Sequence, residues 1–149
     1  MISLYEKRTA LGEFIREPKW DLNGIITPRF PTPTERLGKP FKYFFKHLNR
    51  PTYVFYDKFI LCWVFFERFG NRKGVHIHTL IKGISPIHAP TLQKKCNGFF
   101  GNAIISPYDP NKKGAFYGIK HYGTEELDDF TFWKINSKWR GGANAFKNV

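Results

Sequence analysis

The chain has 149 residues, and 24 Lys and Arg against 12 Asp and Glu give it a formal net charge of +12. This length predicts a single domain over residues 1–149 that can bury a core, and the 18% aromatic content argues against general disorder. Two cysteines are too few for a disulfide framework, and the longest apolar run is too short to cross a bilayer. We therefore expect a soluble protein of the cell interior, in the cytoplasm. Its charge favours a polyanionic partner; the alternative is a basic surface without one.

Turn residues and hydrophobic periodicity divide the chain into elements. In chain order, the sequence predicts a strand over residues 20–27, a helix over 35–48, strands over 59–68 and 75–82, a short helix over 91–97, a strand over 101–108 and a helix over 110–122. The strands 59–68 and 75–82 are apolar and joined by a short turn, so they predict a hairpin. Asp109 and Pro110 are typical of a helix start.

The sequence does not assign the secondary structure of two segments. Residues 1–19 are mixed in character, and residues 124–140 fit either a helix start or a strand. The remaining elements predict an α+β fold, a central antiparallel β-sheet with helices packed on one face.

Two histidines in the second strand of the hairpin are candidate metal ligands. His76 and His78 are two residues apart, so they project from the same face of a strand. Glu67 ends the partner strand and joins that face if it pairs with either histidine. Such a set leaves coordination positions open and suits Mg²⁺ or Mn²⁺. Zinc is less favoured, since no third His or Cys has zinc-like spacing and His88 follows a proline loop. Alternatively, the two histidines are simply packed or exposed to solvent.

A tyrosine and a lysine on the predicted helix 110–122 form a candidate nucleophile pair. Tyr117 and Lys120 are three residues apart and share one helical face. The phenol of a free tyrosine has a pKa of about 10, so nearby cations would have to favour the phenolate. Tyr122 is a competitor for the role, but it lies about 140° around the helix from Tyr117, so packing is its favoured role. The alternative is a core aromatic beside a solvated lysine.

Basic and aromatic side chains near these elements are candidates for nucleic-acid contact. Cations on the predicted loops could bind phosphates, the alternative being plain solvated charges. These residues are Arg29, Arg72, Lys73, Lys112 and Lys113. Trp133 and Trp139 could stack on bases, although packing in the core is the favoured role.

The order of these motifs resembles the HUH endonuclease superfamily, specifically the rolling-circle replication initiators (Rep) of small plasmids and viruses. Residues 20–27 resemble the first motif, His76-Ile77-His78 the metal motif, and residues 116–120 (FYGIK) the Tyr-x-x-Lys motif. The resemblance covers roughly residues 20–122. It implies an RRM-like antiparallel sheet with flanking helices.

The resemblance also implies roles for the residues. Glu67, His76 and His78 would bind Mn²⁺ or Mg²⁺, Tyr117 would attack DNA to give a 5′-phosphotyrosine, and Lys120 would assist. The chain has no Walker-type loop, so we expect no helicase domain of the kind found in larger Rep proteins. Strand separation would then come from a host helicase or from a hairpin or single-stranded origin.

We therefore expect a site-specific single-stranded DNA endonuclease and strand transferase that initiates rolling-circle DNA replication. Its expected partner is origin DNA, and we expect no membrane partner. A single-tyrosine transposase or a mobilisation relaxase would use the same chemistry. Two further alternatives are a non-catalytic nucleic-acid-binding domain and a nuclease that uses water.

Overall fold

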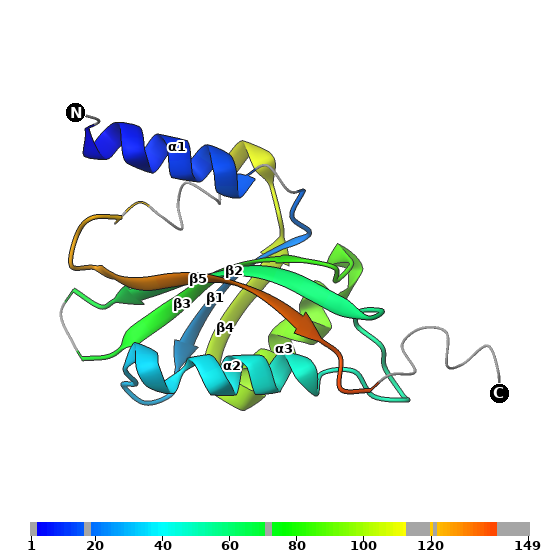
Figure 1. Cartoon of the computed structure of the whole chain (residues 1–149). Coiled ribbons are helices and arrows are strands. Elements are labelled where there is room, and N and C mark those ends of the chain that lie inside the picture. Colours follow the sequence, from blue (N-terminus) through cyan, green and yellow to red (C-terminus); the bar gives the residue numbers. More distant parts are fainter. Residues whose placement is uncertain (1–2, 17–18, 71–72, 113–119, 121, 140–149) are drawn as a thin grey trace.

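A five-stranded antiparallel sheet forms the centre of the computed structural model, which describes residues 3–16, 19–70, 73–112, 120 and 122–139 (Figure 1). The strands are β1 (Leu22–Pro28), β2 (Phe59–Arg68), β3 (Val75–Lys82), β4 (Gly101–Pro107) and β5 (Leu127–Asn136). Their order across the sheet is β4-β1-β3-β2-β5, and each neighbouring pair is antiparallel. The predicted α+β fold is confirmed, and the architecture is consistent with an RRM-like description.

Helices cover both faces of this sheet. They are α1 (Leu4–Arg16), α2 (Gly38–Lys46) and α3 (Ala89–Phe100), with the short 3₁₀ helices η1 (Thr34–Arg36), η2 (Pro86–His88) and η3 (Pro110–Lys112). Figure 1 shows α2 and α3 together on one face and α1 on the other. The prediction that all helices pack on one face was therefore wrong, because the mixed N-terminal segment forms α1.

The larger core lies between the sheet and the pair α2 and α3. Alternate residues of the strands point into it, including Ile77 from β3 and Phe66 from β2. The α2 side chains Phe41 and Phe45 are fully buried there, with ring centroids 4.9 Å apart. Burying a phenylalanine contributes about 1.5–3 kcal/mol, so the spacing of phenylalanines on α2 accounts for where this helix docks.

A smaller core lies between the sheet and α1. It joins Ile15 of α1 and Trp20 to Phe65 of β2 and Leu80 of β3. The indole Nε1–H of Trp20 donates a hydrogen bond to the Ile15 carbonyl oxygen over 2.8 Å, which ties the end of α1 to the segment before β1. The apolar stripe on α1 is narrow, since most of its other residues are polar or small.

The hairpin strands β2 and β3 have the predicted bounds, and the structure also assigns segments that the sequence left ambiguous. The ambiguous segment 124–140 contains strand β5, which pairs with β2 along most of its length. The predicted helix 110–122 begins as η3, and residues 120 and 122 lie in turns, while residues 113–119 and 121 lie outside the described part.

Cys62 is buried without a disulfide, as expected for a small apolar side chain, and Cys96 is likewise buried. None of the described helices has the length and apolar character needed to cross a membrane.

Candidate metal centre

Register in the β2–β3 hairpin brings Glu67 and the two histidines to the same face. Glu67 is paired with His76, and Phe65 is paired with His78. Because side chains alternate between faces, Glu67, His76 and His78 all point to the α1 face, away from the larger core. This is the pairing that the sequence required for a three-residue site.

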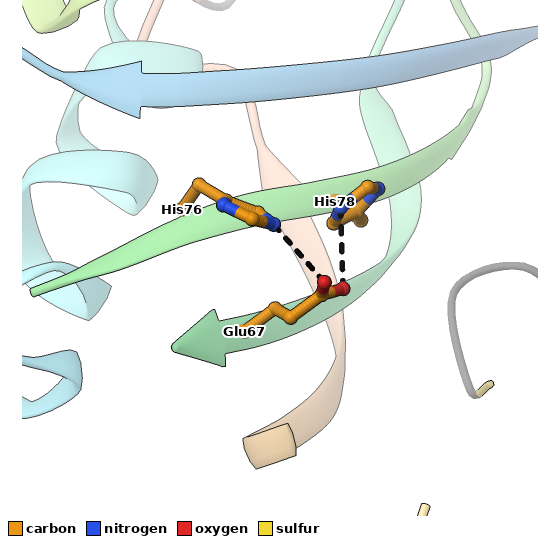
Figure 2. Close-up of side chains that lie close together, drawn as sticks. All are labelled: Glu67, His76 and His78. Carbon is orange, nitrogen blue, oxygen red and sulfur yellow. Dashed lines mark ion pairs between the residues drawn. The ribbon is translucent and has the colours of Figure 1, made fainter. Parts of the chain in front are cut away.

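The three side chains converge on one another (Figure 2). Oε1 of Glu67 lies 3.3 Å from Nε2 of His76, and Oε2 of Glu67 lies 3.3 Å from Nε2 of His78. One ligand atom from each residue lies within 4.8 Å of the other two. Within the described part of the chain, this is the one group of His, Cys, Asp or Glu with such geometry.

Burial and charge define the electrostatics of this site. Glu67 is 7% exposed and His78 is 6% exposed, while His76 is partly open to solvent. Burial by itself raises the pKa of Glu67, but the hydrogen bond from His76 and the positive charges of His78, His76 and Lys120 outweigh it, so the pKa lies below the usual value. The carboxylate is therefore ionised at neutral pH.

The donor set fits a divalent cation. Two atoms that each bind the same metal ion at a distance of about 2.0–2.2 Å lie roughly 3–4 Å from one another. The Glu67 oxygens and the histidine nitrogens are separated by a distance in this range. Two imidazoles and one carboxylate are a mixed nitrogen and oxygen set, which several divalent metals accept. The alternative that the histidines are separately packed does not agree with the convergence of both rings on one carboxylate.

A β-bulge lies beside the site on the neighbouring strand. β5 pairs Asp129 with Phe66 and Leu127 with Glu67, so Asp128 is an extra residue between them. Its carboxylate forms an ion pair with Arg68. Bulges of this kind increase the local twist, and this one lies directly across from a candidate ligand.

A strip of partly or fully exposed side chains on β1 and β4 lies beside the triad. It consists of alternate residues of β1 and β4 on the triad's face, namely Asn23, Ile25, Thr27, Asn102, Ile104 and Ser106. Ile25 is paired with His78 and with Ile104, so the strip is continuous with the triad. The β4 members are exposed and the β1 members are half-buried. Sequence reasoning missed this strip, because it depends on the pairing of β1 with β3 and β4, which lie far apart in the chain.

The structure places some of the other predicted site residues. Lys120 is exposed, and its charge acts on Glu67. Arg29, directly after β1, and Lys73, in the β2–β3 turn, are both exposed. Both lie at the triad's end of the sheet, since the chain after β1 meets the start of β3, where Val75 N–H donates to the Thr32 carbonyl oxygen over 3.1 Å.

The other residues that the sequence singled out do not lie in the described triad. Lys112 ends η3. The proposed nucleophile Tyr117 and the cations Arg72 and Lys113 lie outside the described residues. His88 is hydrogen-bonded to Tyr53 Oη at 2.8 Å, in keeping with its exclusion from the metal set.

Trp133 takes the packing role that was favoured over base stacking. The centroid of its ring lies 5.6 Å from that of Phe41 and 6.4 Å from that of Phe66, and the ring packs against the larger core. Lys42 Nζ lies over the same ring, 4.4 Å from its centroid. This tryptophan is therefore not available as a platform for bases.

Comparison of the chain with protein-family models, with curated proteins and with solved structures gave no significant match.

Proposed function

We propose that this protein is a metal-dependent enzyme that nicks and rejoins single-stranded DNA through Tyr117 and thereby initiates rolling-circle replication. The observation that carries the proposal is the convergence of Glu67, His76 and His78 on one another in a basic domain, with His76 partly open to solvent. The motif order in the sequence supports the same chemistry. The cation in this proposal is Mn²⁺ or Mg²⁺.

The proposed roles follow from the position and chemistry of each group. A divalent cation held by Glu67, His76 and His78 would polarise the scissile phosphate and offset the charge that develops on it. Lys120 would add positive charge next to the transferring phosphoryl group, and its influence on Glu67 supports that placement.

The proposed reaction exchanges one phosphoester bond for another. The phenolic oxygen of Tyr117 forms a bond to phosphorus while the bond from phosphorus to the 3′ oxygen breaks. The phenolic proton passes to solvent, and the departing 3′ oxygen takes up a proton. The products are a free 3′-hydroxyl and a 5′-phosphotyrosine, which the 3′-hydroxyl of the same or another strand can attack to rejoin the DNA.

A single strand would approach along the strip of β1 and β4 beside the triad. The exposed Ile104 offers an apolar contact for a base, and Asn102 and Ser106 offer hydrogen bonds. Arg29 and Lys73 lie at the triad's end of the sheet, where they could bind phosphates. An extended strand suits this strip better than a duplex does, because its bases are free to contact the sheet.

The test uses labelled single-stranded and hairpin oligonucleotides of random sequence, incubated with the full chain and Mn²⁺ and resolved on a denaturing gel. We expect a covalent protein–DNA band with wild type that disappears in Tyr117→Phe, in Glu67→Gln and with chelator. Tyr122→Phe and His88→Ala are matched controls and should keep the band, since Tyr122 packs on Phe130 and His88 lies apart from the triad.

The other outcomes separate the alternatives. Cleavage without a covalent band, equal in wild type and Tyr117→Phe, would show that water is the nucleophile. Binding without cleavage across the whole pool would indicate a nucleic-acid-binding domain. A covalent band formed only with paired ends of a mobile element would favour a transposase, and one formed only at a transfer origin would favour a relaxase.

A further inference from the structure

A groove between α2 and α3 has the chemistry of a second ligand site. It encloses about 350 Å³, within the range of small-ligand pockets. Its walls are Tyr43, Phe44, His47, Leu48, Arg50, Lys95, Gly98 and Phe99, which we call the helical groove. Figure 1 shows α2 and α3 on the face of the sheet opposite α1. Because the triad points to the α1 face, the helical groove lies on the other side of the sheet from the triad.

One wall of the helical groove is an exposed aromatic surface. Tyr43 is 57% exposed and Phe99 is 44% exposed, although other aromatic side chains of the same helices are buried in the larger core. Their planes are within 19° of parallel, with centroids 6.4 Å apart, and the His47 ring lies 4.2 Å from that of Tyr43. Flat aromatic faces in this arrangement favour stacking by another planar ring.

The charge on the helical groove is positive. Arg50 and Lys95 are both exposed, and none of the described lining residues carries a carboxylate. In the described part of the chain, neither cation forms an ion pair with an acidic side chain. An anion could therefore bind here without displacing an internal partner.

We propose that the helical groove binds a nucleotide unit, with the base stacked on Tyr43 or Phe99 and the phosphate held by Arg50 and Lys95. A planar ring joined to an anion is the ligand that matches both walls at once. The unit can come from a single-stranded nucleic acid or from a free nucleotide. This inference is independent of the nicking activity, because it involves none of the triad residues and a separate face.

The test is a titration of the full chain with thymidine 5′-monophosphate and with a dT₁₀ oligonucleotide, in chelator, followed by backbone amide NMR. We expect the Gly98 and Phe99 amide signals to shift with the ligand. Tyr43→Leu should weaken binding by about 5-fold or more, and Tyr43→Phe, which keeps the ring, should not.

Lys95→Glu and Lys94→Glu provide the matched pair for charge. Both residues are exposed on α3, but only Lys95 lines the helical groove. We expect loss of binding in Lys95→Glu and near wild-type binding in Lys94→Glu. Amide spectra of each variant show whether it is folded, and the charge and ring variants test the site separately.

The proposal is overturned if Tyr43→Leu has no effect while both lysine variants weaken binding equally, because the attraction is then general. It is also overturned if the α2 and α3 signals move with anionic phosphatidylglycerol vesicles and not with either nucleotide probe. Shifts with dT₁₀ alone identify a strand as the source of the unit, and shifts with the monophosphate alone identify a free nucleotide; both outcomes support the site.

Discussion

Glu67 and His76 occupy opposite positions in the antiparallel ladder of β2 and β3, and Oε1 of Glu67 lies 3.3 Å from Nε2 of His76. Their neighbours Phe66 and Ile77 are paired as well and point into the larger core. A slip of one residue would expose these apolar side chains and bury the carboxylate among them. Core packing therefore holds the register on which the candidate metal centre depends.

Metal affinity should depend on each member of the triad. We expect Glu67→Gln, His76→Asn and His78→Asn each to lower Mn²⁺ affinity by at least about 10-fold, since even the loss of an outer partner of a metal ligand costs that much. Titration followed by electron paramagnetic resonance measures free Mn²⁺ directly. His88→Asn removes a histidine outside the triad and should bind as wild type does. Equal affinity in all four variants would mean that the triad is not the binding site.

Folding stability should respond to acid through Glu67. Its folded pKa lies below the ordinary value, although burial alone would raise it, because the hydrogen bond from His76 and the charges of His78, His76 and Lys120 favour the ionised form. A depressed carboxyl pKa adds stability above the unfolded pKa of about 4.3, and this is lost as the pH falls through the folded pKa.

Denaturant unfolding of wild type and Glu67→Gln in chelator, between pH 7 and pH 3, tests this response. We expect the difference in the free energy of unfolding between the two proteins to shift against wild type as the pH falls below about 4.3. A difference that stays constant over the whole range would show that the ionisation of Glu67 does not contribute to folding.

The two cysteines should be unreactive in the folded protein. Cys62 and Cys96 are both fully buried, and burial raises the pKa of each thiol to about 12. Because the thiolate is the reactive form, Ellman's reagent at pH 8 should modify neither residue until guanidinium unfolds the chain, when both should react. Fast modification of either thiol under native conditions would place it nearer to solvent than the structure does.

Asn49 should be critical for stability although it is far from the triad. Its Oδ1 accepts a hydrogen bond from Phe55 N–H at 2.7 Å, and its Nδ2 donates to the Tyr56 carbonyl oxygen at 2.7 Å. Asn49→Ala leaves these buried groups without that partner, and each such loss costs about 1–3 kcal/mol. Denaturant unfolding should show the loss, whereas Asn136→Ala, at an exposed position, should change stability by no more than about 0.5 kcal/mol.

Local sequence signals predicted the hairpin well. The apolar run from Phe59 and the turn before Val75 mark β2 and β3 at their observed ends. The alternation around His76 and His78 likewise predicts which side chains share a face, because a strand has a period of two. These features depend on residues close together in the chain, so they can be predicted from the sequence alone.

Segments whose conformation depends on distant partners were not predicted. α1 has a weak apolar stripe, and its position follows from contacts of Ile15 with Trp20 and with strands far along the chain. The sequence of residues 124–140 fitted a helix start as well as a strand, and pairing with β2 makes this segment the strand β5. Tertiary contact overrides weak local preference in both segments.

The sequence by itself determined the α+β class, the bounds of β2 and β3, and the identity of Glu67, His76 and His78 as one candidate ligand set. Only the tertiary structure decided that α1 lies on the triad's face, that β1 and β4 form a partly exposed strip beside the triad, and that α2 and α3 enclose a basic aromatic groove. The physical reason is the range of the interactions. Periodicity and turn chemistry act over a few residues, whereas the covering of a face or the closing of a groove needs side chains from elements far apart in the chain.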